Sequence, residues 1–231
     1  MISVCRTEEK YPLDLIQACK YRALFSSVLA CDSYSRNGDY MVRSLYFDTI
    51  DDKDFFQKVT EQNLRRKIRL RIYSPENDFA KLEIKQKENI FQKKRSLIVS
   101  KEDALQLIDG NYSVLQKYQS KLAAELYSIM CTEVYVPRSI VEYQRYALMA
   151  KENNIRLTFD SRIRATESNF DLYGEKLPLT RVFPQDRVIF EVKYDKFILK
   201  YISDIISTID ARNISSSKYC LSRSVGYPLE L

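Results

Sequence analysis

Histidine is absent from this chain of 231 residues. Its absence excludes three kinds of site: catalytic triads built on histidine, zinc centres with histidine ligands, and histidine general bases. Glycine is also scarce, with 4 residues, and no glycine-rich loop of the kind that cradles nucleotide phosphates occurs. Any catalysis must therefore use carboxylates, lysine, arginine, tyrosine or a metal ion, and side chains must hold any bound phosphate.

Long apolar runs are missing as well. The sequence has no stretch of about 18 apolar residues that could cross a bilayer, and residues 1–6 lack the apolar core of a signal peptide. The five cysteines are scattered and show no Cys-x-x-Cys spacing, which favours reduced, mostly buried thiols. We therefore predict a soluble, cytoplasmic protein.

Length and composition favour one globular domain. The hydrophobic content is 45% and no low-complexity linker divides the sequence, so we predict a single domain over residues 1–231. The chain has 37 Lys and Arg residues against 31 Asp and Glu residues, a formal net charge of +6. This small excess points only weakly to an anionic partner, and the distribution of the charges matters more than their sum.

Charged and apolar residues alternate in four separate segments. In residues 67–73, Lys67, Arg69 and Arg71 fall on one face of an extended strand, and aliphatic residues fall on the other. The same alternation recurs in residues 81–87, 155–160 and 188–194. A single strand of this kind would turn its charges to water, but four such strands can line the interior of a barrel with charge.

Strand and helix signals are spread along the whole chain. We expect strands at 2–11, 40–48, within 65–99 (three strands), 134–150, 155–164 and 187–195. We expect helices at 12–29, 52–59, 100–110, 113–130 and 198–209, and irregular structure at 166–186 and 215–231. Asp51 or Asp52 is expected to cap the second helix, and Ser100 the third.

Arginine-rich strand faces favour binding of a polyanion. Two guanidinium groups about 6 Å apart repel by roughly 3 kcal/mol at an effective dielectric near 20, and a bound polyanion removes this repulsion. The planar arginine fork matches phosphate oxygens, and lysine adds point charge. Three carboxylates on the same faces, Glu8, Glu83 and Glu191, could pair with these cations or bind a hard divalent metal for phosphoryl transfer.

An ordered series of short motifs covers nearly the whole chain. The motifs are Arg6-x-Glu8-x-Lys10-Tyr11, Ser44-Leu45-Tyr46-Phe47-Asp48, Lys67-x-Arg69-x-Arg71-x-Tyr73, Leu82-Glu83-x-Lys85, Lys94-Arg95, Tyr143-x-Arg145, Ile155-Arg156-x-Thr158-Phe159-Asp160, Glu191-Val192-Lys193 and Ser217-Lys218-Tyr219. In this order they resemble the VTC domain, the catalytic polyphosphate polymerase domain of the vacuolar transporter chaperone family. That domain belongs to the triphosphate tunnel metalloenzyme superfamily.

The resemblance implies an α+β fold: an antiparallel eight-stranded β-barrel, the triphosphate tunnel, flanked by α-helices. Its basic interior would hold triphosphate or polyphosphate. By motif position, the resemblance implies a catalytic set, a phosphate-binding set and a metal ligand for Mn²⁺ or Mg²⁺. These are, respectively, Arg69, Arg71, Arg145 and Arg156; Lys10, Lys85, Arg95 and Lys218; and Glu191.

The implied function is a polyphosphate polymerase that transfers the γ-phosphate of ATP to a growing polyphosphate chain. ATP and polyphosphate or tripolyphosphate would be its partners, and no nucleic acid is expected. The sensing domain and membrane segment of the eukaryotic assemblies do not fit within 231 residues, so a separate membrane protein would have to hold the domain at a membrane.

Two alternatives to the polymerase remain open. The extra acid Glu8 lies on the first strand, where the tripolyphosphatase and adenylate cyclase-like branch of the superfamily carries metal-binding glutamates, so this resemblance implies an inorganic triphosphatase or nucleoside triphosphatase as an alternative. The second alternative is a non-catalytic module that binds polyphosphate or nucleic acid, since 17 tyrosines could offer stacking platforms for bases.

Overall fold

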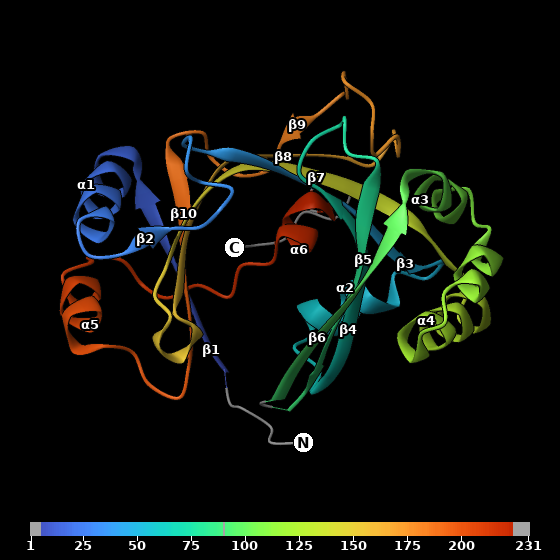
Figure 1. The fold of residues 1–231 in the computed structure, drawn as a ribbon, viewed down its shortest axis with the longest axis horizontal. Coiled ribbons are helices and arrows are strands. Elements are labelled where there is room, and N and C mark those ends of the chain that lie inside the picture. The colour runs from blue at the N-terminus through green and yellow to red at the C-terminus, as the bar shows by residue number, and fades with distance from the viewer. Residues whose placement is uncertain (1–5, 90, 224–231) are drawn as a thin grey trace. The chain divides into compact units, whose positions relative to one another are not determined.

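The computed structural model describes residues 6–89 and 91–223, which form two compact units (Figure 1). Unit 1 takes its residues from Met1–Met41, Tyr143–Arg164 and Arg181–Ser217. Unit 2 takes its residues from Val42–Glu142, Ala165–Thr180 and Lys218–Leu231. Each unit buries a hydrophobic core of its own.

The fold is α+β, with a mostly antiparallel sheet flanked by helices, as the sequence predicts. Its strands are β1 (Arg6–Asp14), β2 (Ala30–Cys31), β3 (Tyr40–Thr49), β4 (Leu64–Ile72), β5 (Phe79–Glu88), β6 (Phe91–Ser100), β7 (Tyr135–Met149), β8 (Arg156–Thr166), β9 (Thr180–Arg181) and β10 (Arg187–Asp195). The hydrogen-bonded order is β1-β10-β8-β7-β3-β4-β5-β6, and the short strands β2 and β9 pair with β7 and β8. Eight strands in a closed barrel were expected, whereas the described residues form ten strands whose order has two ends, at β1 and β6.

The helices follow the predicted positions with two exceptions. They are α1 (Leu15–Ser26), α2 (Lys53–Val59), α3 (Lys101–Ile108), α4 (Lys121–Thr132), α5 (Lys200–Ser207) and α6 (Lys218–Arg223), with 3-10 turns η1 (Tyr112–Lys117) and η2 (Glu152–Asn154). The single helix expected at 113–130 is wrong: Ser120 is extended, and its side chain caps a new helix by accepting from the Leu122 N–H. The expectation of an irregular tail over 215–231 is also wrong at α6, and its residues 224–231 lie outside the described residues. The expected burial of the cysteines is wrong as well: among the described residues, Cys19, Cys31 and Cys131 are exposed and Cys220 is half-buried. None of the described helices is long and apolar enough to cross a membrane.

In unit 1, a capping box fixes the start of α1. The Asp14 carboxylate accepts from the Gln17 N–H at 2.7 Å, and the Gln17 side chain accepts from the Asp14 N–H at 3.1 Å. Pro12, where the sequence suggested that the helix begins, remains in β1. The strand therefore runs directly into the helix.

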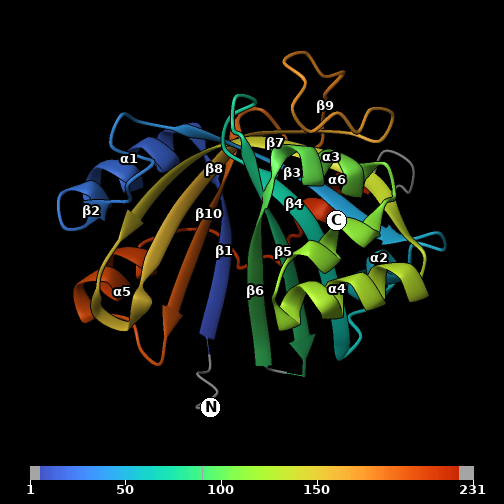
Figure 2. The same cartoon turned by 45° about the vertical axis from the view of Figure 1, so that its right-hand side comes forward.

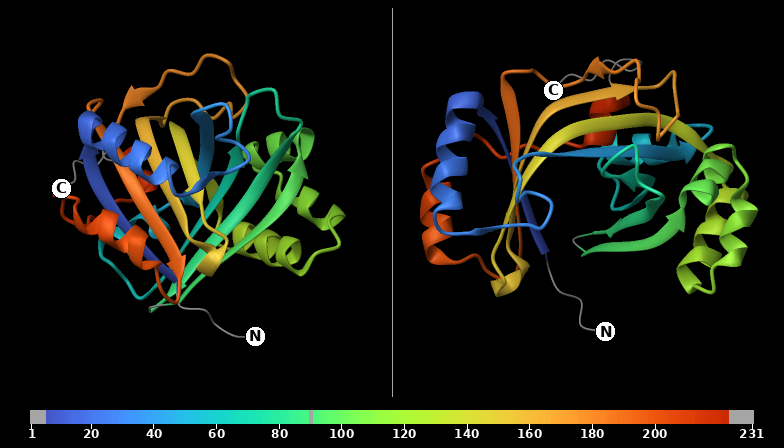
Figure 3. Two further views of the ribbon diagram at one scale, coloured as in Figure 1. Left: turned by 60° about the vertical axis from the view of Figure 1, so that its left-hand side comes forward. Right: turned by 45° about the horizontal axis from the view of Figure 1, so that its top comes forward.

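The core of unit 1 lies between the sheet and the helices α1 and α5 (Figures 1 and 3). Phe25 of α1 and Phe159 of β8 both pack on Phe190 of β10, with ring centroids 5.5 and 4.7 Å apart. Successive strand residues point to opposite faces, so the residues that alternate with these rings lie on the face away from α1 and α5. That face carries the charged positions of β1, β8 and β10.

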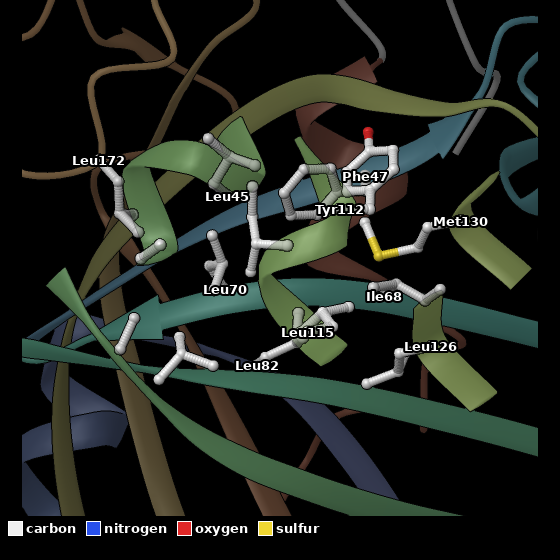
Figure 4. Close-up of a cluster of buried hydrophobic side chains, with 14 of the residues drawn as sticks. Leu45, Phe47, Ile68, Leu70, Leu82, Tyr112, Leu115, Leu126, Met130 and Leu172 are labelled. Atoms are coloured by element: carbon white, nitrogen blue, oxygen red, sulfur yellow. The ribbon is translucent and has the colours of Figure 1, made fainter. Parts of the chain in front are cut away.

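In unit 2, α3, η1 and α4 cover one face of the strands β3 to β6 (Figure 2). Aliphatic side chains of the strands, such as Leu45, Ile68 and Leu82, are fully buried against Leu115 and Leu126 (Figure 4). Each such side chain contributes about 1.5–3 kcal/mol to stability through the apolar area that it removes from water. The predicted apolar stripe of residues 114–129 is confirmed as core.

Asp48, buried at the end of β3, caps α2. Its carboxylate accepts from two backbone N–H groups of the first turn, at 2.8 and 2.9 Å, and from the Tyr219 hydroxyl at 2.6 Å. The predicted cap, Asp51 or Asp52, is wrong, because Asp52 has a φ of 54° and its side chain makes no capping bond. Asp48, from the preceding strand, instead accepts the hydrogen bonds of the free backbone N–H groups at the start of α2.

Asp54, within α2, is a second fully buried carboxyl group. It accepts from the Tyr135 hydroxyl at 2.8 Å and lies 3.7 Å from Nε of Arg66. Burial and the nearby Asp48 carboxylate raise the pKa of Asp54 to about 7, although Tyr135 and Arg66 act in the opposite direction. The folded protein therefore binds this proton more tightly than the unfolded chain does.

The raised pKa of Asp54 predicts a loss of stability as the pH increases. The stabilisation is fully present below the ordinary pKa near 4 and is lost as the pH rises through about 7. Asp54→Asn removes the titration, so the free energy of unfolding of the wild type should fall relative to this variant by about 4 kcal/mol between pH 4 and pH 8. Urea unfolding over this range measures the difference. The exposed neighbour supplies the control, Asp51→Asn, and an equal effect of both variants would contradict the prediction.

Candidate phosphate-binding sites

A buried carboxylate surrounded by cations lies on the charged face of unit 2. Glu83 of β5, which is 3% exposed, accepts from Nε of Arg69 at 2.8 Å. Its other contacts are to Nη1 of Arg71 at 3.9 Å and to Nζ of Lys94 at 2.6 Å. We call these four residues the Glu83 cluster. Three cations share one carboxylate, so the cluster carries a net positive charge.

The charges of the Glu83 cluster alter the pKa values of its members. Although burial opposes the effect, Arg69, Arg71 and Lys94 hold the pKa of Glu83 well below its ordinary value, so this carboxylate stays ionised. Burial lowers the pKa of Lys94 to about 8, and the two arginines add to this, while Glu83 opposes it. An anion bound beside Lys94 would favour its protonated form.

Strand β3 orients the two arginines of the cluster. Tyr46 stands opposite Arg69 in the β3–β4 register and accepts from its Nη1 at 2.8 Å. Ser44 stands opposite Arg71 and accepts from its Nε at 3.3 Å. Each guanidinium group thus contacts Glu83 and a side chain of β3 before any ligand binds. This lowers the conformational entropy that the arginines lose when they bind an anion.

Of the phosphate-binding set, Lys85 lies on the same face as the cluster, opposite Lys67 on β4 and Lys94 on β6. Arg95 does not. It pairs with Ile84 across the strands, on the face covered by α4, and donates to the Glu125 carboxylate of α4. The sequence pointed to Arg95, whereas the structure brings its neighbour Lys94 to the cluster.

Lys218, also in the predicted phosphate-binding set, is the first residue of α6. Buried polar contacts fix this helix within unit 2. The Tyr219 hydroxyl donates to Asp48, Ser222 hydrogen-bonds to Ser139 at 2.7 Å, and Nη2 of Arg223 donates to Asp52 at 2.6 Å. The position of Lys218 is therefore set by residues of β3, β7 and the start of α2.

Unit 1 carries a second cluster in which acids and bases alternate across β1 and β10. In the register, Glu8 stands opposite Lys193, and Lys10 opposite Glu191. Lys10 lies 2.9 Å from Glu8, and Lys193 lies 2.8 Å from Glu191 and 3.7 Å from Glu8. We call these four residues the Glu191 cluster. Lys10 also donates to the carbonyl oxygen of Ser216 at 2.7 Å, which ties β1 to the segment that follows α5.

Two further arginines of the predicted catalytic set lie in unit 1. Arg145 on β7 makes two hydrogen bonds to the fully buried Asp160 of β8, at 2.6 and 2.7 Å, and lies 3.9 Å from Glu191. Burial alone would lower the pKa of Arg145. Asp160, Tyr143 and Glu191 outweigh it and raise this pKa above its ordinary value. Most of the hydrogen-bonding capacity of the Arg145 guanidinium is therefore used by Asp160. Arg145 joins β7 to β8 and also adds positive charge near Glu191.

Arg156 is held more loosely than Arg145. Its Nη2 donates to the Asp32 carboxylate at 2.7 Å and to the Tyr40 hydroxyl at 3.1 Å. Its Nε is buried and makes no hydrogen bond within residues 6–89 and 91–223. The side chain is 35% exposed, so Arg156 retains donors for an incoming anion.

The carboxylates of the Glu191 cluster fit a metal that is shared with substrate. Over the described part of the chain, no three Cys, Asp or Glu side chains gather into a complete ligand set. Mg²⁺ commonly uses one or two carboxylates and takes its remaining ligands from water and substrate phosphates. Glu191, which is 4% exposed, and its neighbour Glu8 could supply two such oxygen ligands.

The model of the VTC domain family matches residues 5–227. The chain belongs to the VTC domain family. This membership supports a function that involves triphosphate or polyphosphate. No curated protein matches the sequence of this VTC domain.

Two solved structures resemble this VTC domain at low sequence identity. A candidate adenylate cyclase from Bacillus halodurans superposes with a TM-score of 0.51 at 12% identity, covering 92% of this chain and 95% of the other. PH1012 from Pyrococcus horikoshii gives a TM-score of 0.47 at 10% identity, with 93% and 99% covered. The first of these likenesses shows a common fold.

Proposed function

We propose that this VTC domain is a metal-dependent polyphosphate polymerase that transfers the γ-phosphate of ATP to a polyphosphate chain. The Glu83 cluster carries the proposal. It keeps three cations around one ionised carboxylate, on a sheet face whose other strand positions add more lysine and arginine. Such an arrangement offers charge and donors to several phosphate oxygens at once.

The reaction requires positioning and charge stabilisation more than covalent chemistry by the protein. An oxygen of the terminal phosphate of the chain attacks the γ-phosphorus of ATP, the bond to the bridging oxygen breaks, and ADP leaves with that electron pair. Charge on the transferred group is spread over its three equatorial oxygens. Arg69 and Arg71, already oriented by Tyr46, Ser44 and Glu83, would stabilise this charge without reorganisation.

Glu191, with Glu8 beside it, would hold the metal. A bound Mn²⁺ or Mg²⁺ neutralises phosphate charge and orients the phosphates. Lys10 and Lys193 contact these carboxylates, and they would shift toward phosphate oxygens as the metal takes their place. The carboxylates hold the lysines in the absence of ligand and would hold the metal in its presence.

Triphosphate hydrolysis is the second candidate, and Glu8 favours it. Glu8 places a second carboxylate beside Glu191 on the adjacent strand, where it could orient an attacking water as well as a metal. Polymerase and hydrolase use the same donor phosphate and differ in the acceptor, so the products distinguish them.

The deciding experiment incubates purified protein with ATP and Mn²⁺ and separates the products on a gel. We expect ADP together with long-chain polyphosphate. Orthophosphate released without chain growth would select hydrolysis. Tripolyphosphate binding without any product, under every metal tried, would reduce the domain to a binding module.

The lowered pKa of Lys94 predicts proton uptake when an anion binds the Glu83 cluster. With a pKa of about 8, Lys94 should be partly deprotonated at pH 8, and a bound tripolyphosphate should restore the missing protons. Calorimetric titration in two buffers of different ionisation enthalpy measures this uptake. Lys94→Arg keeps the charge and should abolish the uptake, whereas identical uptake in wild type and variant would show that another group titrates.

A further inference from the structure

Two tyrosines of unit 1 form a ring pair next to Arg156: Tyr34, between β2 and β3, and Tyr40, the first residue of β3. Their ring centroids are 5.3 Å apart, and the ring planes are inclined by 34°. Tyr40 is half-buried, and its hydroxyl accepts from Nη2 of Arg156 at 3.1 Å and donates to Asp32 at 3.3 Å. Tyr34 is 47% exposed, so a large part of it remains in contact with solvent. We call Tyr34 and Tyr40 the tyrosine pair.

Hydrogen bonds hold the segment that carries Tyr34 in place without a ligand. The Asp32 carboxylate accepts from the backbone N–H groups of Tyr34 and Ser35, at 3.1 and 2.9 Å. The Ser35 hydroxyl accepts from the Ala147 N–H at 2.8 Å, and the Asp32 N–H donates to the Ala147 carbonyl oxygen at 3.0 Å. The segment is thus fixed to β7, and a flat ligand that stacks on Tyr34 would need to order few groups of the protein.

Arg156 connects the tyrosine pair to the Glu191 cluster. It stands opposite Lys193 in the β8–β10 register, and Lys193 lies 2.8 Å from Glu191. Side chains directly opposite on neighbouring antiparallel strands have Cβ atoms about 5 Å apart. The hydrogen bonds of Arg156 to Asp32 and Tyr40 both use Nη2, and the side chain is 35% exposed. An anion bound at the Glu191 cluster could therefore also contact Arg156, and a group attached to this anion would lie next to the tyrosine pair.

A nucleoside triphosphate carries the two kinds of group that this arrangement fits. Its phosphates bind cations, whereas its base has a flat π-face that stacks on aromatic rings. A tripolyphosphate has phosphates of the same kind but nothing that can stack. The cationic strands alone would bind both ligands, so any preference for a nucleotide requires an aromatic surface beside the phosphate site.

We propose that the tyrosine pair is the stacking site for the nucleobase of the donor nucleotide, while Arg156 contacts the phosphates of that nucleotide. The pair makes the protein bind ATP more tightly than an inorganic triphosphate of similar charge. The inference rests on the proposed function for the role of ATP as donor, but binding of the nucleotide does not require turnover.

The test compares ATP with tripolyphosphate, without metal, by calorimetric titration. Tyr34→Ala should weaken ATP binding by about tenfold, the loss expected for one base stacked on an aromatic ring, and change tripolyphosphate binding less than twofold. Tyr34→Phe keeps the ring and should retain the ATP affinity of the wild type. The matched control, Tyr201→Ala, removes a tyrosine of α5 with a similar exposure of 44%, and it should leave both affinities unchanged.

Equal weakening of ATP and tripolyphosphate by Tyr34→Ala would overturn the site, because Tyr34 would then act only through Arg156. An unchanged ATP affinity would overturn it as well. A larger loss for single-stranded RNA than for ATP would assign the tyrosine pair to nucleic-acid binding instead. The proposed function fails separately: a protein whose ATP affinity depends on Tyr34 but that makes no polyphosphate keeps the nucleotide site and loses the polymerase.

Discussion

Glu191→Gln is expected to lower kcat by about 100- to 1,000-fold while the protein still binds tripolyphosphate in the absence of metal. If Glu191 holds the metal as proposed, the change removes a metal-ligand charge, and with it several kcal/mol of stabilisation of the transferring phosphoryl group. Lys193 and Lys10 lose an opposing charge at 2.8 and 4.0 Å, so metal-free anion binding should be equal or tighter. Steady-state kinetics with Mn²⁺ and calorimetry without it measure the two effects separately.

Glu9→Gln is the matched control for Glu191→Gln. Glu9 is next to Glu8 on β1, but its side chain faces the other side, where it accepts from the Tyr11 hydroxyl at 2.7 Å. This variant should keep metal-dependent turnover. Full activity of Glu191→Gln, or an equal loss in both variants, would mean that Glu191 serves as a partner for lysine rather than as a metal ligand.

Arg145→Ala is expected to destabilise the protein by about 3–5 kcal/mol. Both members of the Arg145–Asp160 pair are buried, and removal of the arginine takes away the bidentate partner of a carboxylate that is 0% exposed. Arg69→Ala should change stability by about 1 kcal/mol or less, because Arg69 is partly exposed and Glu83 keeps its contact with Lys94. Urea unfolding compares the two alanine variants.

A double variant separates the electrostatic cause from a loss of packing. Arg145→Met combined with Asp160→Leu removes the buried charges together, and it should recover most of the stability lost in Arg145→Ala. If the double variant is as unstable as Arg145→Ala, the loss comes from the shape of the side chain. If Arg145→Ala is as stable as the wild type, the Arg145–Asp160 pair does not stabilise the packing of β7 on β8.

The faces of the strands could be predicted from the sequence because the side-chain period of a strand is two. The alternation in residues 67–73 correctly placed Arg69 and Arg71 on one face and the core aliphatic residues on the other. The same rule assigned Glu191 and Lys193 to one face of β10. These assignments need no knowledge of the neighbouring strand.

The faces of β6 on which Lys94 and Arg95 lie could not be predicted from alternation. A shift of one residue in register exchanges the two faces, and Lys94-Arg95 offers a cation to either face. The register sets Lys94 opposite Lys85 and leaves Arg95 to Glu125 of α4. The sequence shows no clear alternation here, because Leu97, Ile98 and Val99 are consecutive apolar residues, although only Leu97 and Val99 pack on the core and Ile98 is exposed.

Partners distant in the sequence account for the remaining differences. Nothing local shows that Asp48 caps a helix in place of Asp52, that Asp160 engages Arg145, or that α6 forms at Lys218. The helix α6 is short, and it depends on buried contacts such as Tyr219 with Asp48 rather than on its own propensity. Such contacts appear only when the strands and helices are assembled.

Phosphorus NMR of the reaction with ATP and Mn²⁺ tests polyphosphate synthesis most directly. Each ADP formed should be matched by one new phosphate in the interior of a polyphosphate chain, with little orthophosphate, and Glu191→Gln should show neither signal. Orthophosphate equal to the ADP formed, with no interior chain signal, would contradict the polymerase and assign this VTC domain to hydrolysis.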